Sequence, residues 1–117
     1  MNLSGMDDLL RRLNSLANPE EIKERALDKG AEYMQQKIAQ NTGRSDRDRE
    51  HAADNVVIQK QEGQRLIGYA PEHFYMMFKE FGTSKQTAEP VVGPTFEREI
   101  ENAKQIMADE IRRGLNL

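Results

Sequence analysis

The feature that most constrains the fold is a helical repeat of apolar residues that returns in separate stretches of the chain. In the last and longest stretch, apolar side chains recur every three or four residues between Gly93-Pro94 and Gly114. The spacing predicts one long helix whose buried stripe is formed by Phe96, Ile100, Ala103, Met107 and Ile111. Because such a helix owes most of its stability to packing, other elements must cover this stripe.

Two more helices are expected near the N-terminus. The first has Ser4 and Asp7 as possible capping acceptors, and its stripe is Met6, Leu9, Leu10, Leu13, Leu16 and Ala17. Asn18-Pro19 predicts a new helix start, because Asn can cap and Pro is tolerated at the first helical position. The stripe of this second helix would be Leu27, Ala31, Met34 and Ile38, with Ile22 and Ala26 beside it. Gly30 in its middle costs about 1 kcal/mol relative to Ala, which close packing against a neighbouring element would explain.

A segment rich in charges follows the end of the second helix at Asn41-Thr42-Gly43. It carries three positive and three negative side chains and no apolar anchor, and these are Arg44, Asp46, Arg47, Asp48, Arg49 and Glu50. We expect an exposed, mobile loop at about residues 42–53.

The middle of the chain predicts a β-hairpin and a short helix. Asn55 to Gln61 and Arg65 to Tyr69 favour strands joined by a turn at Glu62-Gly63-Gln64. After Pro71, a helical stripe of Phe74, Met77, Phe78 and Phe81 precedes a stop at Gly82; a strand with Phe74, Met76 and Phe78 on one face is the competing interpretation. The result is a single α+β domain over residues 1–117, with N-terminal helices, a small antiparallel sheet, a short central helix and a long C-terminal helix.

Charge and composition argue against several classes of protein. The 17 Lys and Arg residues are outnumbered by 20 Asp and Glu, so the chain lacks the basic surface that grips nucleic acid through its phosphates. Cysteine is absent, which excludes disulfides and thiolate metal sites. The N-terminus does not resemble a signal peptide and no apolar run is long enough to span a membrane, so we expect a protein of the cytoplasm without a membrane partner.

Residues with catalytic potential form no recognisable pattern. His51 and His73 lack the spacing of metal ligands. We expect His51 to be a solvated loop residue and His73 to be an ordinary residue in the first turn of the short helix. Neither Ser45 nor Ser84 lies in a nucleophile motif. The acidic residues of the last helix alternate with basic ones, as on a solvated face, and the glycines form no phosphate-binding fingerprint. We therefore predict no catalytic site, no metal and no cofactor.

One ordered set of residues resembles a known family. Its pieces are Tyr69-Ala70, Glu80-Phe81-Gly82-Thr83-Ser84-Lys85, Ala88, Pro90 and Pro94, preceded by Ala26-Leu27-x-x-Gly30-Ala31 and a Thr42-Gly43 turn. Over roughly residues 20–110 the chain resembles the head-to-tail joining, or tail-completion, proteins of long-tailed bacteriophages. It departs from them at Val91-Val92-Gly93, where the family often has an aromatic residue, Leu and Arg, and at the charged loop, which replaces a shorter Leu-Arg-x-Ser segment.

The resemblance implies a structural protein of the phage neck, assembled in the host cytoplasm and located in the virion. It implies a homo-oligomeric ring, commonly hexameric, that contacts the connector or stopper protein and the tail tube or tail terminator, with DNA passing through without specific binding. We assign the loop Arg44 to Glu50 to docking or to the lumen, and the candidate assembly contacts are Phe78, Glu80, Phe81, Gly82, Thr83, Lys85, Pro90 and Pro94. These last residues also fit the simpler role of a core helix and its connector.

A different class of function fits the same residues. The chain could instead be a small soluble adaptor or regulatory protein that binds one partner through an amphipathic helix.

Overall fold

The computed structural model describes residues 3–42, 52–73, 76–82, 87, 88 and 90–117. The elements are α1 (Leu3–Asn14), α2 (Pro19–Asn41), β1 (Val56–Gln61), β2 (Gln64–Tyr69), α3 (Met76–Phe81) and α4 (Val92–Gly114). Single 3-10 turns at Ala52–Asp54 and Pro71–His73 flank the hairpin. The α+β class, the order of the elements and the long last helix are confirmed.

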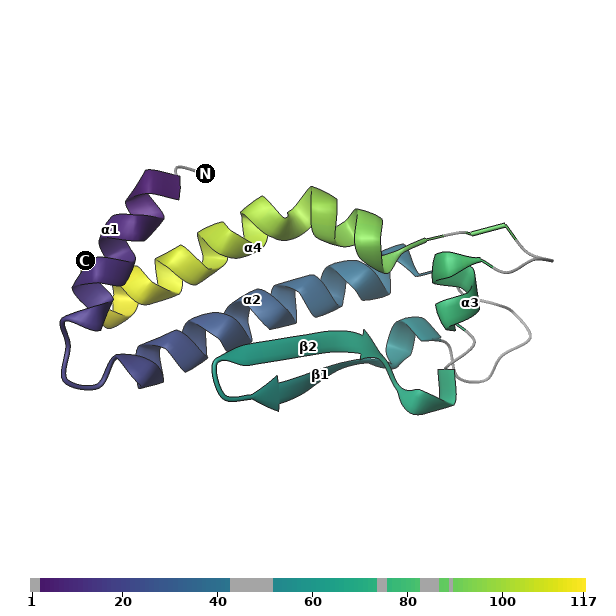
Figure 1. Cartoon of the computed structure of the whole chain (residues 1–117), viewed down its shortest axis with the longest axis horizontal. Coiled ribbons are helices and arrows are strands. Elements are labelled where there is room, and N and C mark those ends of the chain that lie inside the picture. The colour runs from purple at the N-terminus through teal and green to yellow at the C-terminus, as the bar shows by residue number, and fades with distance from the viewer. Residues whose placement is uncertain (1–2, 43–51, 74–75, 83–86, 89) are drawn as a thin grey trace.

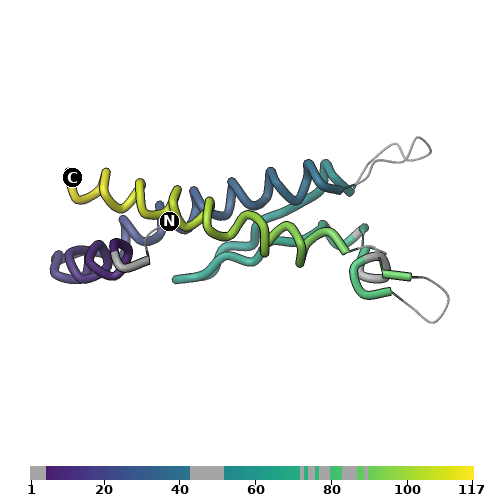
Figure 2. The backbone as a smooth tube through the Cα atoms, turned by 90° about the horizontal axis from the view of Figure 1, so that it is seen from above, coloured from purple at the N-terminus to yellow at the C-terminus, as the bar shows by residue number. Residues whose placement is uncertain are grey.

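The two long helices determine the shape of the molecule. α2 and α4 lie side by side and run in opposite directions, and the hairpin of β1 and β2 lies along α2 (Figure 1). α1 crosses the end of the pair near the C-terminus, and α3 lies at the far end. The molecule measures 52 × 24 × 22 Å. Figure 2 shows the same elongated shape from above, where α4 can be followed along its whole length.

The core consists of two apolar clusters that share α2 and α4. Near the termini, α1 contributes Leu9 and Leu13 to a cluster with Ile22 and Ala26 of α2 and Ala108 and Ile111 of α4. In the other half, Met34 and Ile38 of α2 meet Val56 of β1 and Ala103 of α4. Each cluster needs both long helices, so neither the hairpin nor α1 forms a core of its own.

Gly30 explains how the long helices approach each other. A Cβ atom at this position would lie 2.6 Å from Sδ and 2.8 Å from Cγ of Met107 on α4. The expectation that close packing accounts for this glycine is confirmed. Gly114, the last residue of α4, is in a similar position, because a Cβ there would lie 2.9 Å from the side chain of Ile22.

Two boundaries differ from the sequence prediction. α1 ends at Asn14, because the N–H groups of Ser15 and Leu16 turn back to the carbonyls of Arg12 and Leu13. Leu16, 40% exposed, and Ala17 therefore lie beyond the helix instead of on its buried stripe. α4 begins at Val92, before Gly93-Pro94, because its first N–H groups receive an acceptor from outside the helix, as described below.

The predicted caps and stripes are partly wrong. Asn18 makes no side-chain capping bond to α2, and Ser4 lies inside α1, where it cannot be the N-cap. On the stripes, Leu10 is exposed and Leu27 only half-buried, and Thr95 and Ala108 of α4 are buried without having been expected. The stripe of a helix follows what packs against it, and α1 and α2 contact α4 from different sides.

The predicted β-hairpin is confirmed, with strands that differ by one residue at their starts. Val56 pairs with Tyr69, Ile58 with Ile67 and Gln61 with Gln64 in antiparallel order. Gly63 occupies the turn with φ of 73°, a conformation that L side chains rarely adopt. Thus a two-residue turn fixes which side chains of each strand face the helices.

The short central helix is confirmed, but its buried side is not the one predicted. Met76 is 6% exposed, whereas Phe81 is 79% exposed. Five residues rotate a helix by about 140°, so these two side chains point in nearly opposite directions. Phe74 and the side chains of Met77 and Phe78 lie outside the described part of the chain. His73 is buried in the preceding 3-10 turn, which corrects the expectation of an ordinary first-turn residue.

We predict that Gly30→Leu lowers the free energy of unfolding by about 1–3 kcal/mol, because the new side chain overlaps Met107. The matched change Gly5→Ala in α1, where a Cβ meets nothing within 4 Å, should raise stability by roughly 0.5–1 kcal/mol through helix propensity. Urea denaturation measures both. Equal effects of the two substitutions would contradict the packing role of Gly30.

Candidate assembly surfaces

Glu80 of α3 supplies the acceptor that starts α4. Its carboxylate accepts hydrogen bonds from the N–H groups of Val91 at 2.8 Å, Val92 at 2.9 Å and Gly93 at 3.0 Å. The first N–H groups of a helix have no partner within it, and the helix dipole favours a negative charge at this end. Partial burial raises the pKa of Glu80, but the three donors outweigh it and the pKa lies below its usual value. We call this arrangement the Glu80 cap.

The Glu80 cap brings several of the predicted contact residues together. Phe81 and Gly82, which has φ of 76°, directly follow the capping residue, and Pro94 lies half-buried in the first turn of α4. Pro90 is exposed just before that turn. The side chain of Phe78 and the residues Thr83, Lys85, Arg44, Asp46, Arg47, Asp48, Arg49 and Glu50 lie outside the described ranges. The carboxylate of Glu80 is therefore engaged within the chain, while Phe81 projects from it.

An apolar pocket of about 370 Å³ opens beside Phe81. Its walls come from the end of β2, the following 3-10 turn, α3 and the start of α4, and they include Tyr69, Ala70, Met76, Phe81 and Val92. Sequence reasoning did not find this pocket, because it depends on the Glu80 cap, which holds α3 against α4. The one sign of it in the sequence was that three of its lining residues, Tyr69, Ala70 and Phe81, belong to the pattern that resembles the phage family.

The same end of the molecule is tied together by hydroxyl groups. Thr42 Oγ1 donates to the carbonyl of Ile38 at 2.7 Å and lies 2.8 Å from the hydroxyl of Tyr69, from which it accepts. Asn41 Nδ2 donates to Oγ1 of the fully buried Thr95 at 3.1 Å. The end of α2 is thus bonded to both β2 and α4. Thr42 and Tyr69, two pieces of the pattern that lie far apart in the sequence, meet directly.

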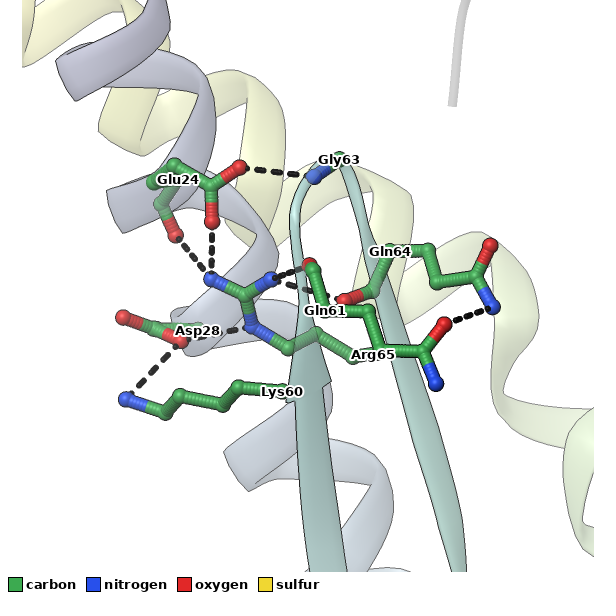
Figure 3. A network of polar contacts seen from close by, with 7 residues as sticks. All are labelled: Glu24, Asp28, Lys60, Gln61, Gly63, Gln64 and Arg65. Carbon is green, nitrogen blue, oxygen red and sulfur yellow. Dashed lines mark hydrogen bonds and ion pairs between the residues drawn. The ribbon is translucent and has the colours of Figure 1, made fainter.

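At the other end of the hairpin, Arg65 joins β2 to α2 (Figure 3). Its side chain is 6% exposed; Nε donates to Asp28 at 2.8 Å, and Nη2 donates to Glu24. Lys60 Nζ lies 3.3 Å from Asp28, and the N–H of Gly63 donates to Glu24 at 2.9 Å. Two cations and two carboxylates therefore balance in this cluster, which we call the Arg65 cluster.

The Arg65 cluster shifts the titration of its acids. The hydrogen bonds from Arg65 hold the pKa of Glu24 below its ordinary 4.5 and the pKa of Asp28 below its ordinary 3.8. Charge-assisted bonds of this kind favour the ionised carboxylate. Sequence reasoning missed the cluster, because its partners lie on elements that only the tertiary fold brings together.

Within the ranges that the structure describes, no group of His, Asp and Glu side chains is arranged to hold a metal ion. None of the helices in those ranges combines the length and the hydropathy that a membrane span needs.

We predict that the stabilisation from the Arg65 cluster disappears in acid. Because the folded-state pKa values of Glu24 and Asp28 are lowered, their contribution is present above the ordinary values of 4.5 and 3.8 and is lost as the pH falls through the folded values. Arg65→Met should therefore destabilise the protein clearly at about pH 7 and much less at about pH 3. Urea denaturation at both pH values measures the difference. Lys23→Met, which removes a surface pair with Glu20, is the control and should have little effect at either pH.

We also predict that Glu80→Ala lowers the free energy of unfolding by about 0.5–2 kcal/mol, the usual cost of losing a helix cap. Hydrogen exchange should localise the effect to the amides of Val91, Val92 and Gly93, which lose their acceptor. The matched control is Glu97, an exposed residue of α4. Glu97→Ala should change stability by less than about 0.5 kcal/mol. Unchanged exchange at these three amides in Glu80→Ala would show that the cap is unimportant.

Comparison with known proteins assigns the chain to a family. A family model named HK97-gp10-like, described as "Bacteriophage HK97-gp10, putative tail-component", matches residues 7–82, well over half of the 117 residues. Searches of curated proteins and of solved structures found no match. The matched region contains α2, the hairpin, α3 and the capping residue Glu80, and it agrees with the resemblance seen in the sequence. The chain therefore belongs to the HK97-gp10-like family of bacteriophage tail components.

Proposed function

We propose that this tail component is a neck protein of a long-tailed phage, which forms a ring between the capsid connector and the tail tube and lets DNA pass. The observation that carries the proposal is Phe81, 79% exposed beside an open apolar pocket. Exposed aromatic side chains next to apolar pockets are typical of protein contacts, because their burial between two chains supplies much of the binding energy. The α3 end of the molecule is therefore the proposed contact between copies.

The distribution of charge supports passage of DNA. With 17 basic and 20 acidic residues the chain has a net charge of -3. Of the basic residues, Arg65 and Lys60 are paired with carboxylates. A channel through which DNA must move should not bind phosphates tightly, and an acidic subunit does not.

The partners of the ring are part of the proposal. They are the connector or stopper protein on the head side and the tail tube or tail terminator on the other. Pro90 and Pro94, with Thr83 and Lys85, would add to the contacts around Phe81, and the loop from Arg44 to Glu50 would dock on a neighbour or face the lumen. A hexamer is the number of copies that the resemblance favours.

The adaptor hypothesis has less support in the fold. A protein that binds its partner through an amphipathic helix needs a helix whose apolar stripe is free. Here α1 buries Leu9 and Leu13, α2 buries Met34 and Ile38, and α4 buries Ala103, Ala108 and Ile111. Most of the apolar stripe of each helix is thus used within the chain, although Phe96 and Ile100 of α4 are only half-buried.

We predict that the purified protein forms rings visible by negative-stain electron microscopy, and that Phe81→Ser abolishes them without changing the melting temperature. The side chain is exposed in the single chain, so its loss should not affect folding. Leu66→Thr, which removes another large exposed apolar side chain from the hairpin, is the control and should leave the rings intact. Native mass spectrometry gives the number of copies. Rings of Phe81→Ser equal to those of the unchanged protein would refute the role of Phe81, and a protein that remains a monomer under all conditions would argue against the ring.

A further inference from the structure

β2 has an edge that is available for pairing with another strand. The N–H of Ala70 donates to Asn55 at 2.8 Å, which makes this pair a hydrogen-bonded one, and bonded pairs alternate along an antiparallel ladder. The backbone groups of Arg65, Ile67 and Tyr69 therefore face away from β1. In the described part of the chain the sheet has two strands, so this edge is not paired.

The edge of β1 is in a different situation. Its outward carbonyl at Val56 accepts a hydrogen bond from Gln35 Nε2 of α2 at 2.6 Å. α2 thus approaches the β1 edge, whereas the β2 edge lies on the side of α4 (Figure 3). Any added strand would therefore have to lie next to β2.

Two apolar pockets follow the β2 edge in line. The first, of about 160 Å³, lies where β2 meets the α2–α4 pair, and its walls include Arg65 and Ile67 of β2, Leu27 and Met34 of α2, and Phe96 and Ile100 of α4. The second is the pocket of about 370 Å³ at Tyr69 and Phe81. The residues whose N–H and C=O groups face away from β1, which are 65, 67 and 69, also line these two pockets. Backbone hydrogen-bonding groups and apolar pockets therefore occur together along the edge of β2. We call this line the β2 trough.

Exposed strand edges are commonly protected by charged side chains, by proline or by short length. β2 has six residues and no proline, and its one charged side chain, Arg65, points inward and is neutralised by Glu24 and Asp28. The residues on the face of the hairpin that points away from the helices are also uncharged. They are Val57, Gln59, Gln61, Gln64, Leu66 and Gly68. Among the described residues of the hairpin, no exposed charge or proline on this edge repels an incoming strand.

We propose that the β2 trough binds an extended segment of a neighbouring tail protein, which adds a third strand beside β2. A strand fits both features, because its backbone pairs with residues 65, 67 and 69 while alternate apolar side chains enter the two pockets. A helix fits only the pockets, since its backbone groups are already bonded within it. The segment should have apolar residues at every second position facing the trough and no charge among them.

This contact rests on the proposed neck function and deepens it, because it specifies how one subunit would hold a different protein of the tail. It is separate from the contact between copies at Phe81, although the two surfaces share the larger pocket. Because copies that meet at Phe81 would compete for that pocket, binding to the trough is measured at protein concentrations at which the chain is monomeric.

The test uses a synthetic seven-residue peptide in which threonine alternates with valine, isoleucine and phenylalanine. In the antiparallel pairing that we expect for this strand, residues whose side chains face the trough also direct their N–H groups at β2. N-methylation of the apolar residues should therefore weaken binding about tenfold or more, whereas N-methylation of the threonines should not. Hydrogen exchange followed by NMR should show new protection at the amides of Arg65, Ile67 and Tyr69. Absence of binding, or equal binding of both methylated peptides, would overturn the proposal.

A matched pair of protein variants tests the edge itself. Ile58 and Ile67 are opposite each other in a pair that is not hydrogen-bonded, so proline at either position keeps the ladder between β1 and β2. Ile67→Pro removes an outward donor of the β2 edge and should weaken peptide binding about tenfold, whereas Ile58→Pro removes one from the β1 edge and should not. Equal loss in both variants would overturn the proposal. Rings without peptide binding would refute the strand contact alone, and peptide binding without rings would refute the ring.

Discussion

The fold depends on the close antiparallel contact of α2 and α4. Both apolar clusters use these two helices, and Gly30 allows the contact by leaving room for Met107. The hydroxyl of Tyr33 on α2 also donates to Glu99 of α4 at 2.8 Å. α1 covers one end of the pair and the hairpin covers one side, and neither would be stable alone, since a two-stranded hairpin is marginal in water. Without the helix pair, the other elements would have nothing to pack on.

The hairpin is attached to this pair at both ends by polar contacts. At its turn the Arg65 cluster bonds it to α2, and at its open end the hydroxyl of Tyr69 bonds to Thr42. Between them, Val56 and Ile67 pack on the helices. The sheet is thus fixed in orientation as well as covered. A fixed strand loses less entropy when it pairs with a second strand, which suits β2 to its proposed role.

Much of the fold could be predicted from the sequence, because its elements are defined by local patterns. The stripe of α2, the turn at Gly63 and the stop at Gly82 follow from spacing and from backbone conformation, and they were confirmed except for Leu27, which is only half-buried. The side of α3 that is buried could not be predicted, because Met76 and Phe81 are both apolar and only tertiary packing distinguishes them. The same holds for the Glu80 cap and the Arg65 cluster, which join residues far apart in the chain. Phe81 was expected on the buried stripe of α3, which is wrong because it is exposed, whereas its role as an assembly contact stays a prediction.

The Glu80 cap has a further consequence for the segment between α3 and α4. Because Glu80 binds the N–H groups of Val91, Val92 and Gly93, it holds together the two ends of the chain between them. The free energy of closing such a loop rises slowly with its length, by about 0.6 kcal/mol for each doubling. Insertions or deletions in this segment would therefore leave α4 in register with α2. The family match ends at Gly82, just after the capping residue. A change in the length of the segment that follows need not disturb the helix pair.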